Sequence, residues 1–117
     1  NACGARLFVS IHFNSFTQPE VNYTKTFWGV REKDEAFSQT MNATLVAALA
    51  PGTNLSDGDV EEFGTGSLLR ALMLGTLVET VFLSNPEEAA RLADPGGARL
   101  DAIAAAIASG VEGSLVS

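Results

Sequence analysis

The stretch FVSIHFN, residues 8–14, is an apolar run that ends in polar residues. A nearly continuous apolar run rich in β-favouring side chains is typical of a strand covered on both faces, as in a parallel sheet with helices on either side. We therefore predict such a strand over residues 6–13. It carries His12, the only histidine of the chain.

A second segment, LVETVFLSNP at residues 77–86, has the same form and predicts a strand over residues 76–82. It contains Glu79, and a carboxylate buried without a partner costs several kcal/mol, so this side chain needs a partner or solvent. Two interpretations remain open. Glu79 is either an exposed glutamate on an edge strand or a general base whose pKa is raised by apolar surroundings at the C-terminal edge of the sheet.

The rest of the chain alternates strand and helix patterns. Such alternation predicts an α/β fold with a central, mostly parallel sheet flanked by helices. Asn85 followed by Pro86 is a typical helix start. The other predicted elements are a half-exposed or edge strand at 21–28, a helix at 32–50, a surface loop at 52–66, a short helical turn at 67–73, and helices at 86–93 and 98–111.

Composition limits the possible partners. The chain has 117 residues, enough for one domain, with 46% hydrophobic and 18% charged residues. Fourteen acidic and seven basic residues give a net charge of −7, which argues against non-specific binding to nucleic acid or to an anionic membrane. No apolar run is long enough for a membrane span. Cys3 is the only cysteine, so no intrachain disulfide forms.

His12 lies at the C-terminal end of the first strand, and Asn14 directly follows this strand, at the end where ligands bind in open α/β sheets. A neutral imidazole is the commonest metal ligand, but a histidine at a strand end also hydrogen-bonds loop carbonyls. Asn14 is either a residue that hydrogen-bonds a substrate or a turn residue. The residues alone leave these alternatives open.

Taken together and in order, the two segments resemble the zinc-dependent N-acetylmuramoyl-L-alanine amidases, which cleave bacterial cell-wall peptidoglycan. The resemblance covers nearly the whole chain. The matching stretches are LFVSIHFN at 7–14, LRAL at 69–72, LVETVFLSNPEEA at 77–89 and IAAAIASGV at 103–111.

The resemblance implies a hydrolase of the amide between N-acetylmuramic acid and L-alanine. It implies that His12 is a zinc ligand and that Glu79 is the catalytic carboxylate, with Asn14 as a substrate-binding residue. Zn²⁺ is then the cofactor and peptidoglycan the partner. A wall substrate implies a periplasmic, cell-envelope or secreted location.

The chain also departs from the family pattern. The family's first zinc-binding histidine and its glutamate ligand precede the point where this chain starts, at Asn1 and without methionine. We therefore expect residues 1–117 to be the C-terminal portion of an amidase catalytic domain whose N-terminal strand and helix are missing. Such a fragment is expected to be inactive and to self-associate through exposed apolar surface.

Two substitutions support an alternative function. Val81 stands where the family usually has a glycine, and Phe13 where a small residue is usual. A bulky Val81 beside Glu79 is expected to narrow the cleft. With the missing ligands, these residues favour a non-catalytic peptidoglycan-binding or scaffold domain that keeps the amidase fold, whereas His12 and Glu79 favour the enzyme.

Overall fold

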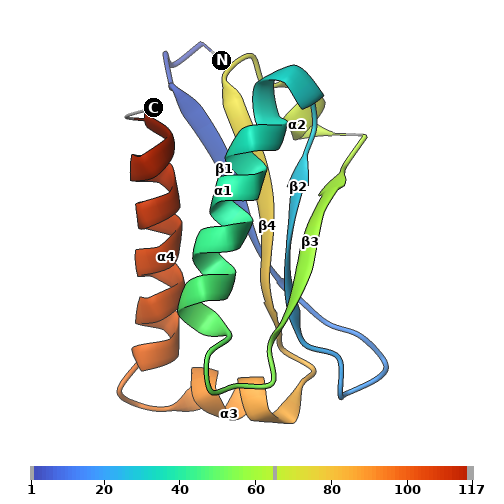
Figure 1. Cartoon of the computed structure of the whole chain (residues 1–117), viewed down its shortest axis with the longest axis vertical. Coiled ribbons are helices and arrows are strands. Elements are labelled where there is room, and N and C mark those ends of the chain that lie inside the picture. The colour runs from blue at the N-terminus through green and yellow to red at the C-terminus, as the bar shows by residue number, and fades with distance from the viewer. Residues whose placement is uncertain (1, 65, 116–117) are drawn as a thin grey trace.

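A computed structural model describes residues 2–64 and 66–115. It contains a four-stranded sheet with the strand order β1-β4-β2-β3, together with four helices. Figure 1 shows α1 in front of the sheet, α4 beside α1 on the left, and α3 below. The elements are β1 (Leu7–Asn14), β2 (Tyr23–Trp28), α1 (Arg31–Leu49), β3 (Ser56–Glu62), α2 (Ser67–Arg70), β4 (Leu74–Phe82), α3 (Pro86–Ala93) and α4 (Ala98–Leu115).

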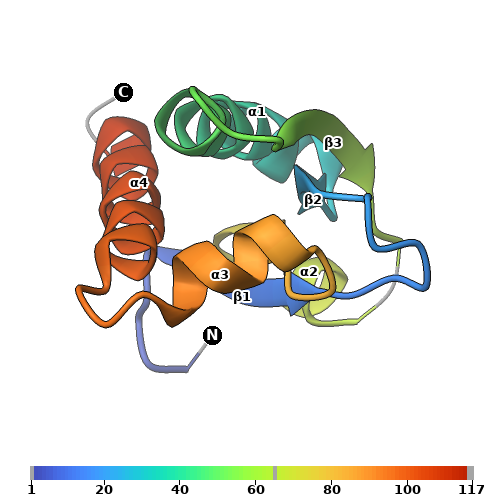
Figure 2. The ribbon, with the colours of Figure 1, turned by 90° about the horizontal axis from the view of Figure 1, so that it is seen from below.

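Two of the three strand pairings are parallel. β1 runs parallel to β4, and β2 runs parallel to β3, while β2 and β4 pair in the antiparallel sense. The predicted α/β fold with a mostly parallel sheet flanked by helices is thereby confirmed. Seen from below, α1 and α4 lie together on one side of the strands (Figure 2).

The hydrophobic core lies between this pair of helices and the sheet. Met41 and Leu45 of α1 are fully buried and pack with Val78 of β4 and Ile103 of α4. Burying each side chain of this size stabilises the fold by about 1.5–3 kcal/mol. Gly110 permits the close approach of α4 to α1, because a Cβ at this position would lie 2.7 Å from Sδ of Met41.

Hydrogen bonds of Asp34 connect the start of α1 to the sheet. Its buried carboxylate accepts hydrogen bonds from the backbone N–H of Val30 (2.9 Å) and of Gly75 at the start of β4 (2.9 Å). Lys33 donates to the same carboxylate at 2.6 Å and to the carbonyl of Met73 at 2.7 Å. The bond to Val30 satisfies the backbone N–H of the residue before α1, and the bonds to Gly75 and Met73 link the start of α1 to the start of β4.

The predicted start of α3 is confirmed. The side chain of Asn85 accepts a hydrogen bond from the N–H of Glu88 at 3.0 Å, and Pro86 occupies the first turn. The predicted short helical turn and final helix are also present as α2 and α4, although α4 extends to Leu115.

The predicted surface loop at 52–66 is wrong in its centre, where β3 forms. Its sequence, SDGDVEE, is poor in β-favouring residues, and the strand exists because its backbone pairs with β2. Only glycine fits at position 58, because a Cβ there would clash with the Tyr23 ring at 2.6 Å and with the carbonyl oxygen of Thr24 at 2.8 Å. Thr65, within the predicted loop, lies outside the described residues.

Two predictions about strand environments are also wrong. β2 is not an edge strand but lies between β4 and β3, with four of its six residues buried. β1 is not covered on both faces: it lies at one end of the strand order, and none of its residues is fully buried. Position in the sheet depends on long-range pairing, which the local hydrophobic pattern does not encode. No described helix is long and apolar enough to cross a membrane.

Candidate active site

His12 and Glu79 lie directly opposite each other on the neighbouring strands β1 and β4. Thr76 of β4 faces α1, since its hydroxyl lies 2.7 Å from that of Ser38. Side chains alternate between the two faces of a strand, so Glu79, three residues further on, points away from α1. His12 shares that face because paired residues project to the same side. The structure therefore brings together the two residues that the sequence singled out.

Lys25 of β2 flanks Glu79 on its other side. Lys25 and Glu79 are register partners in the antiparallel pair of β2 and β4. The Lys25 ammonium forms an ion pair of 3.2 Å with Glu61 of β3 and lies 5.9 Å from the ring centroids of both Tyr23 and Phe27. Across the face, four strands thus supply one imidazole, two carboxylates and one ammonium group.

The environment of Glu79 suits a proton acceptor. Its side chain is half-buried, and burial is the main cause that raises the pKa of its carboxyl above the ordinary value of 4.5. The charges of His12 and Lys25 lower this pKa, while that of Glu61 raises it. A carboxylate with a raised pKa is a stronger base than an exposed one, as general-base catalysis requires. The edge-strand interpretation of Glu79 is wrong, because β4 is an interior strand.

Asn14 reaches Glu79 from the end of β1. Its Nδ2 donates a hydrogen bond to Oε2 of Glu79. A register shift precedes this contact, since His12 pairs with Glu79 whereas Asn14 pairs with Phe82. Two residues of β1 therefore oppose three of β4, as in a β-bulge.

The same bulge decides the position of Val81. Val81 is fully buried in the core with Leu49, Leu55 and Ile103. Phe82, by contrast, stacks edge-on against Tyr23 at a centroid distance of 4.6 Å. The expectation that Val81 lies beside Glu79 and narrows the cleft is therefore wrong: the extra residue in β4 turns Val81 towards the helices. Phe13 is exposed.

His12 is exposed and held mainly through its strand. Its Nε2 lies 2.9 Å from the hydroxyl of Ser10, and its carbonyl accepts a hydrogen bond of 3.1 Å from Thr80. An accessible imidazole beside a carboxylate can take part in metal binding. Within residues 2–64 and 66–115, however, no three His, Cys, Asp or Glu side chains gather closely enough to hold a metal ion. A protein zinc site needs at least three ligands, so these residues do not form one by themselves.

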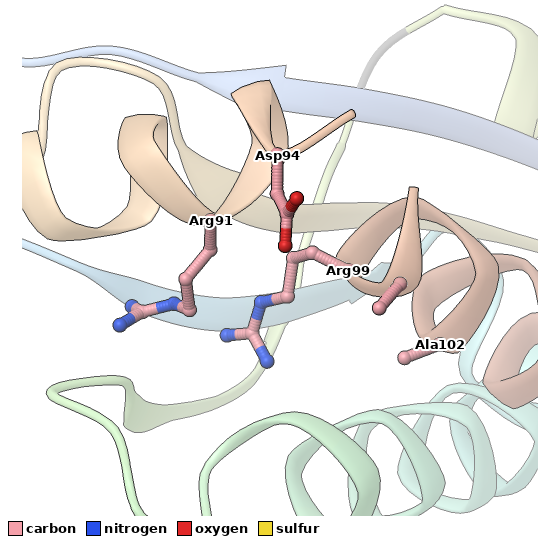
Figure 3. Close-up of a pocket in the computed structure, with 5 residues that line it drawn as sticks. Arg91, Asp94, Arg99 and Ala102 are labelled. Carbon is pink, nitrogen blue, oxygen red and sulfur yellow. The ribbon is translucent and has the colours of Figure 1, made fainter. Parts of the chain in front are cut away.

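A second charged cluster lies at the junction of α3 and α4. A cavity of about 270 Å³ is lined there by Arg91, Asp94, Ala98, Arg99 and Ala102 (Figure 3). The guanidinium of Arg99 is engaged by Glu88, at 2.7 and 2.8 Å, and by the carbonyl of Leu49 at 2.9 Å. These contacts join secondary-structure elements, so we assign the cluster to the stability of the fold.

Sequence reasoning missed Lys25, Glu61 and the contact of Asn14 with Glu79. Lys25 belongs to a segment predicted as a half-exposed or edge strand and Glu61 to a segment predicted as a loop, so nothing placed them beside Glu79. The alternation of residues in β2 was the available signal, because it puts Lys25 on the face opposite to Thr24 and Thr26.

A sheet that gathers a carboxylate, an imidazole and an ammonium group on one open face defines an α/β protein with a candidate hydrolytic site. The family model for N-acetylmuramoyl-L-alanine amidase matches residues 1–113, and the chain belongs to this family. A search of curated protein sequences gave no significant match.

Solved amidase structures share the fold. AmiC2 of Nostoc punctiforme, an N-acetylmuramoyl-L-alanine amidase, is 25% identical and has a TM-score of 0.84, over 99% of this chain and 61% of that one. An N-acetylmuramoyl-L-alanine amidase from Clostridium difficile 630 is 25% identical with a TM-score of 0.85, over 100% and 61%. The catalytic domain of CwlV from Bacillus (Paenibacillus) polymyxa var. colistinus is 29% identical with a TM-score of 0.75, over 97% and 60%. The chain thus spans about three fifths of their length.

Proposed function

We propose that residues 1–117 are the C-terminal portion of a catalytic domain that hydrolyses the amide between N-acetylmuramic acid and L-alanine in peptidoglycan. The observation that supports this most directly is the register pairing of His12 with Glu79 on the open face of a sheet that belongs to the amidase family. The substrate also implies a periplasmic, cell-envelope or secreted location.

Glu79 is the catalytic carboxylate in this proposal. It accepts a proton from the attacking water and returns it to the amine of L-alanine as the amide bond breaks. Its half-buried position and its raised pKa support this role, because they strengthen the carboxylate as a base. The flanking ammonium of Lys25 balances its negative charge.

His12 is one ligand of a zinc ion in this proposal. The described residues supply no complete ligand set, so at least two further ligands come from other parts of the full-length protein. The family membership supports zinc as the cofactor.

The non-catalytic alternative is not favoured. It rested in part on a bulky Val81 beside Glu79, but Val81 is buried in the core instead. It also rested on Phe13, which is exposed, and on zinc ligands that the family carries before the position matching Asn1.

A peptidoglycan-release assay tests the proposed function. Purified peptidoglycan incubated with the full-length protein and zinc should yield stem peptides with a free L-alanine amine and glycan strands with a free lactyl carboxylate. Mass spectrometry identifies both ends of the cleaved bond. Binding of peptidoglycan without release of these ends would instead support a wall-binding domain.

Zinc content is expected to differ between the full-length protein and residues 1–117. One imidazole gives too few ligands for tight binding, so the 117-residue chain should retain far less than one zinc per molecule after dialysis. The full-length protein should retain about one zinc per catalytic domain. Elemental analysis measures both, and stoichiometric zinc in the short chain would show that its own residues complete the site.

We also propose that residues 1–117 associate with a second copy of themselves through the free edge of β1. The two sheet edges differ: β3 carries the acidic residues of SDGDVEE, which repel a second copy, whereas β1 exposes Ile11 by 52% and Phe13 by 42%. No described strand pairs with the outer side of β1. An unpaired, apolar strand edge is a template for pairing with another chain.

Sedimentation velocity over a wide concentration range tests this association. We expect residues 1–117 to shift from monomer to dimer as concentration rises, and Ile11→Lys to remain monomeric because a lysine blocks edge pairing. Leu100→Lys, at an exposed position on α4, is the control and should behave like the unmodified chain. Identical behaviour of Ile11→Lys and the unmodified chain would refute pairing through β1.

A further inference from the structure

The side-chain amide of Asn14 is held at both of its ends. Nδ2 donates to Oε2 of Glu79, and Oδ1 accepts a hydrogen bond of 2.8 Å from the backbone N–H of Ser15. With the oxygen engaged by a donor and the nitrogen facing an acceptor, the orientation of the amide is determined. Asn14 therefore presents N–H donors to the carboxylate in a defined direction.

The backbone around Asn14 is also fixed to the end of β4. The Asn14 carbonyl accepts from the N–H of Leu83 at 2.8 Å, and the N–H of Phe16 donates to the hydroxyl of Ser84 at 2.9 Å. These bonds span more than sixty residues of sequence. They hold the segment after β1 against β4, so that the Asn14 side chain cannot move far from Glu79.

The β-bulge between β1 and β4 determines the position from which Asn14 contacts Glu79. In a regular parallel pair, the residue two positions after His12 would lie opposite Val81, but the register shift places Asn14 opposite Phe82. The backbone of Asn14 therefore lies opposite Phe82, and its side chain reaches back along β4 to the carboxylate of Glu79. Bulges re-aim side chains in this way next to active sites.

We propose that Asn14 is a positioning residue for Glu79, holding Oε2 so that Oε1 faces the reacting water. An amide nitrogen only donates and does not ionise, so it restricts the carboxylate without competing for the proton. A hydrogen bond to a charged group contributes about 1.5–3 kcal/mol, enough to select one carboxylate orientation. This inference rests on the proposed amidase activity, and it differs from a direct contact between Asn14 and the substrate.

Steady-state kinetics of the full-length protein with zinc separate the two roles. For Asn14→Ala we expect kcat to fall about 10- to 100-fold while KM stays within about twofold, because misplacing a catalytic group slows the chemical step. For Asn14→Asp, kcat should fall further, because the variant places a second negatively charged carboxylate next to that of Glu79. Gln18→Ala, which removes an exposed side-chain amide from the same loop, should match the unmodified protein.

A double-mutant cycle tests whether Asn14 acts through Glu79. In the Glu79→Gln background, the further change Asn14→Ala should alter the residual rate little, because the oriented carboxylate is already gone. An equal loss in both backgrounds would overturn the positioning role. A raised KM with unchanged kcat would also overturn it and would indicate substrate contact.

A spectroscopic measurement separates failure of this inference from failure of the proposed function. In the full-length protein, Glu79→Ala should shift the side-chain ¹⁵N–¹H₂ resonances of Asn14 and leave those of Gln18 unchanged. Unshifted Asn14 resonances overturn the contact whatever the activity. If the resonances shift but no stem peptide with a free L-alanine amine is released, the contact between Asn14 and Glu79 is supported and the amidase proposal is refuted.

Discussion

Glu79→Gln in the full-length protein is expected to lower the rate of release of L-alanine-linked peptides by about 10²- to 10⁴-fold, the usual contribution of a general acid–base group. Glutamine has nearly the same shape as glutamate and can still accept a hydrogen bond from Asn14, but it does not take up the proton of water. The loss should therefore appear in kcat. Rates of product release, followed by chromatography, measure the effect.

The control for this experiment is Glu87→Gln, which makes the same chemical change at an exposed position in the first turn of α3. Its activity should equal that of the unmodified protein. Zinc content and thermal unfolding of Glu79→Gln should also be unchanged, so that the loss is not due to misfolding. Activity that survives in Glu79→Gln would rule out the proposed role of this residue.

Glu88→Gln is expected to destabilise the chain by about 3–5 kcal/mol, because it leaves buried guanidinium charge without its partner. The Glu88 carboxylate is fully buried and accepts hydrogen bonds from Arg99, Arg91 and Asn22. Arg99 is also largely buried. Through these contacts Glu88 joins α3 to α4 and to the segment before β2. Urea unfolding followed by circular dichroism measures the free energy of unfolding.

The loss of unfolding free energy caused by Glu88→Gln should depend on pH. Burial alone raises the pKa of Glu88, but hydrogen bonds from Arg99, Arg91 and Asn22 outweigh it and lower the pKa from 4.5 to about 2. A group whose pKa is lowered by folding stabilises the protein above its unfolded pKa and loses that contribution as pH falls through the folded pKa. The difference between unmodified chain and Glu88→Gln should therefore be constant above about pH 5 and shrink towards pH 2.

Glu87→Gln serves again as the matched control, since exposed substitutions usually change stability by less than about 0.5 kcal/mol. A difference between the unmodified chain and Glu88→Gln that stays constant down to pH 2 would contradict the lowered pKa of Glu88. Equal stability of the Glu87 and Glu88 variants would show that the ion pairs contribute nothing net.

Local sequence predicted the elements that depend on short-range chemistry. The cap of α3 followed from Asn85 and Pro86, because capping involves residues three or four positions apart. The strands with His12 and Glu79 followed from their apolar runs. β3 could not be found in this way, since its acidic sequence forms a strand only through pairing with β2. The burial of β2 was missed for the same reason.

By itself, the sequence determined the α/β class, the two residues that identify the candidate site and the family resemblance. Only the tertiary structure decided that His12 and Glu79 are register partners, that Lys25 flanks Glu79, and that a bulge turns Val81 into the core. The physical reason is that side-chain direction in a strand follows register. Register is set by hydrogen bonds between segments more than fifty residues apart, and shifting it by one residue reverses which side chains face the site.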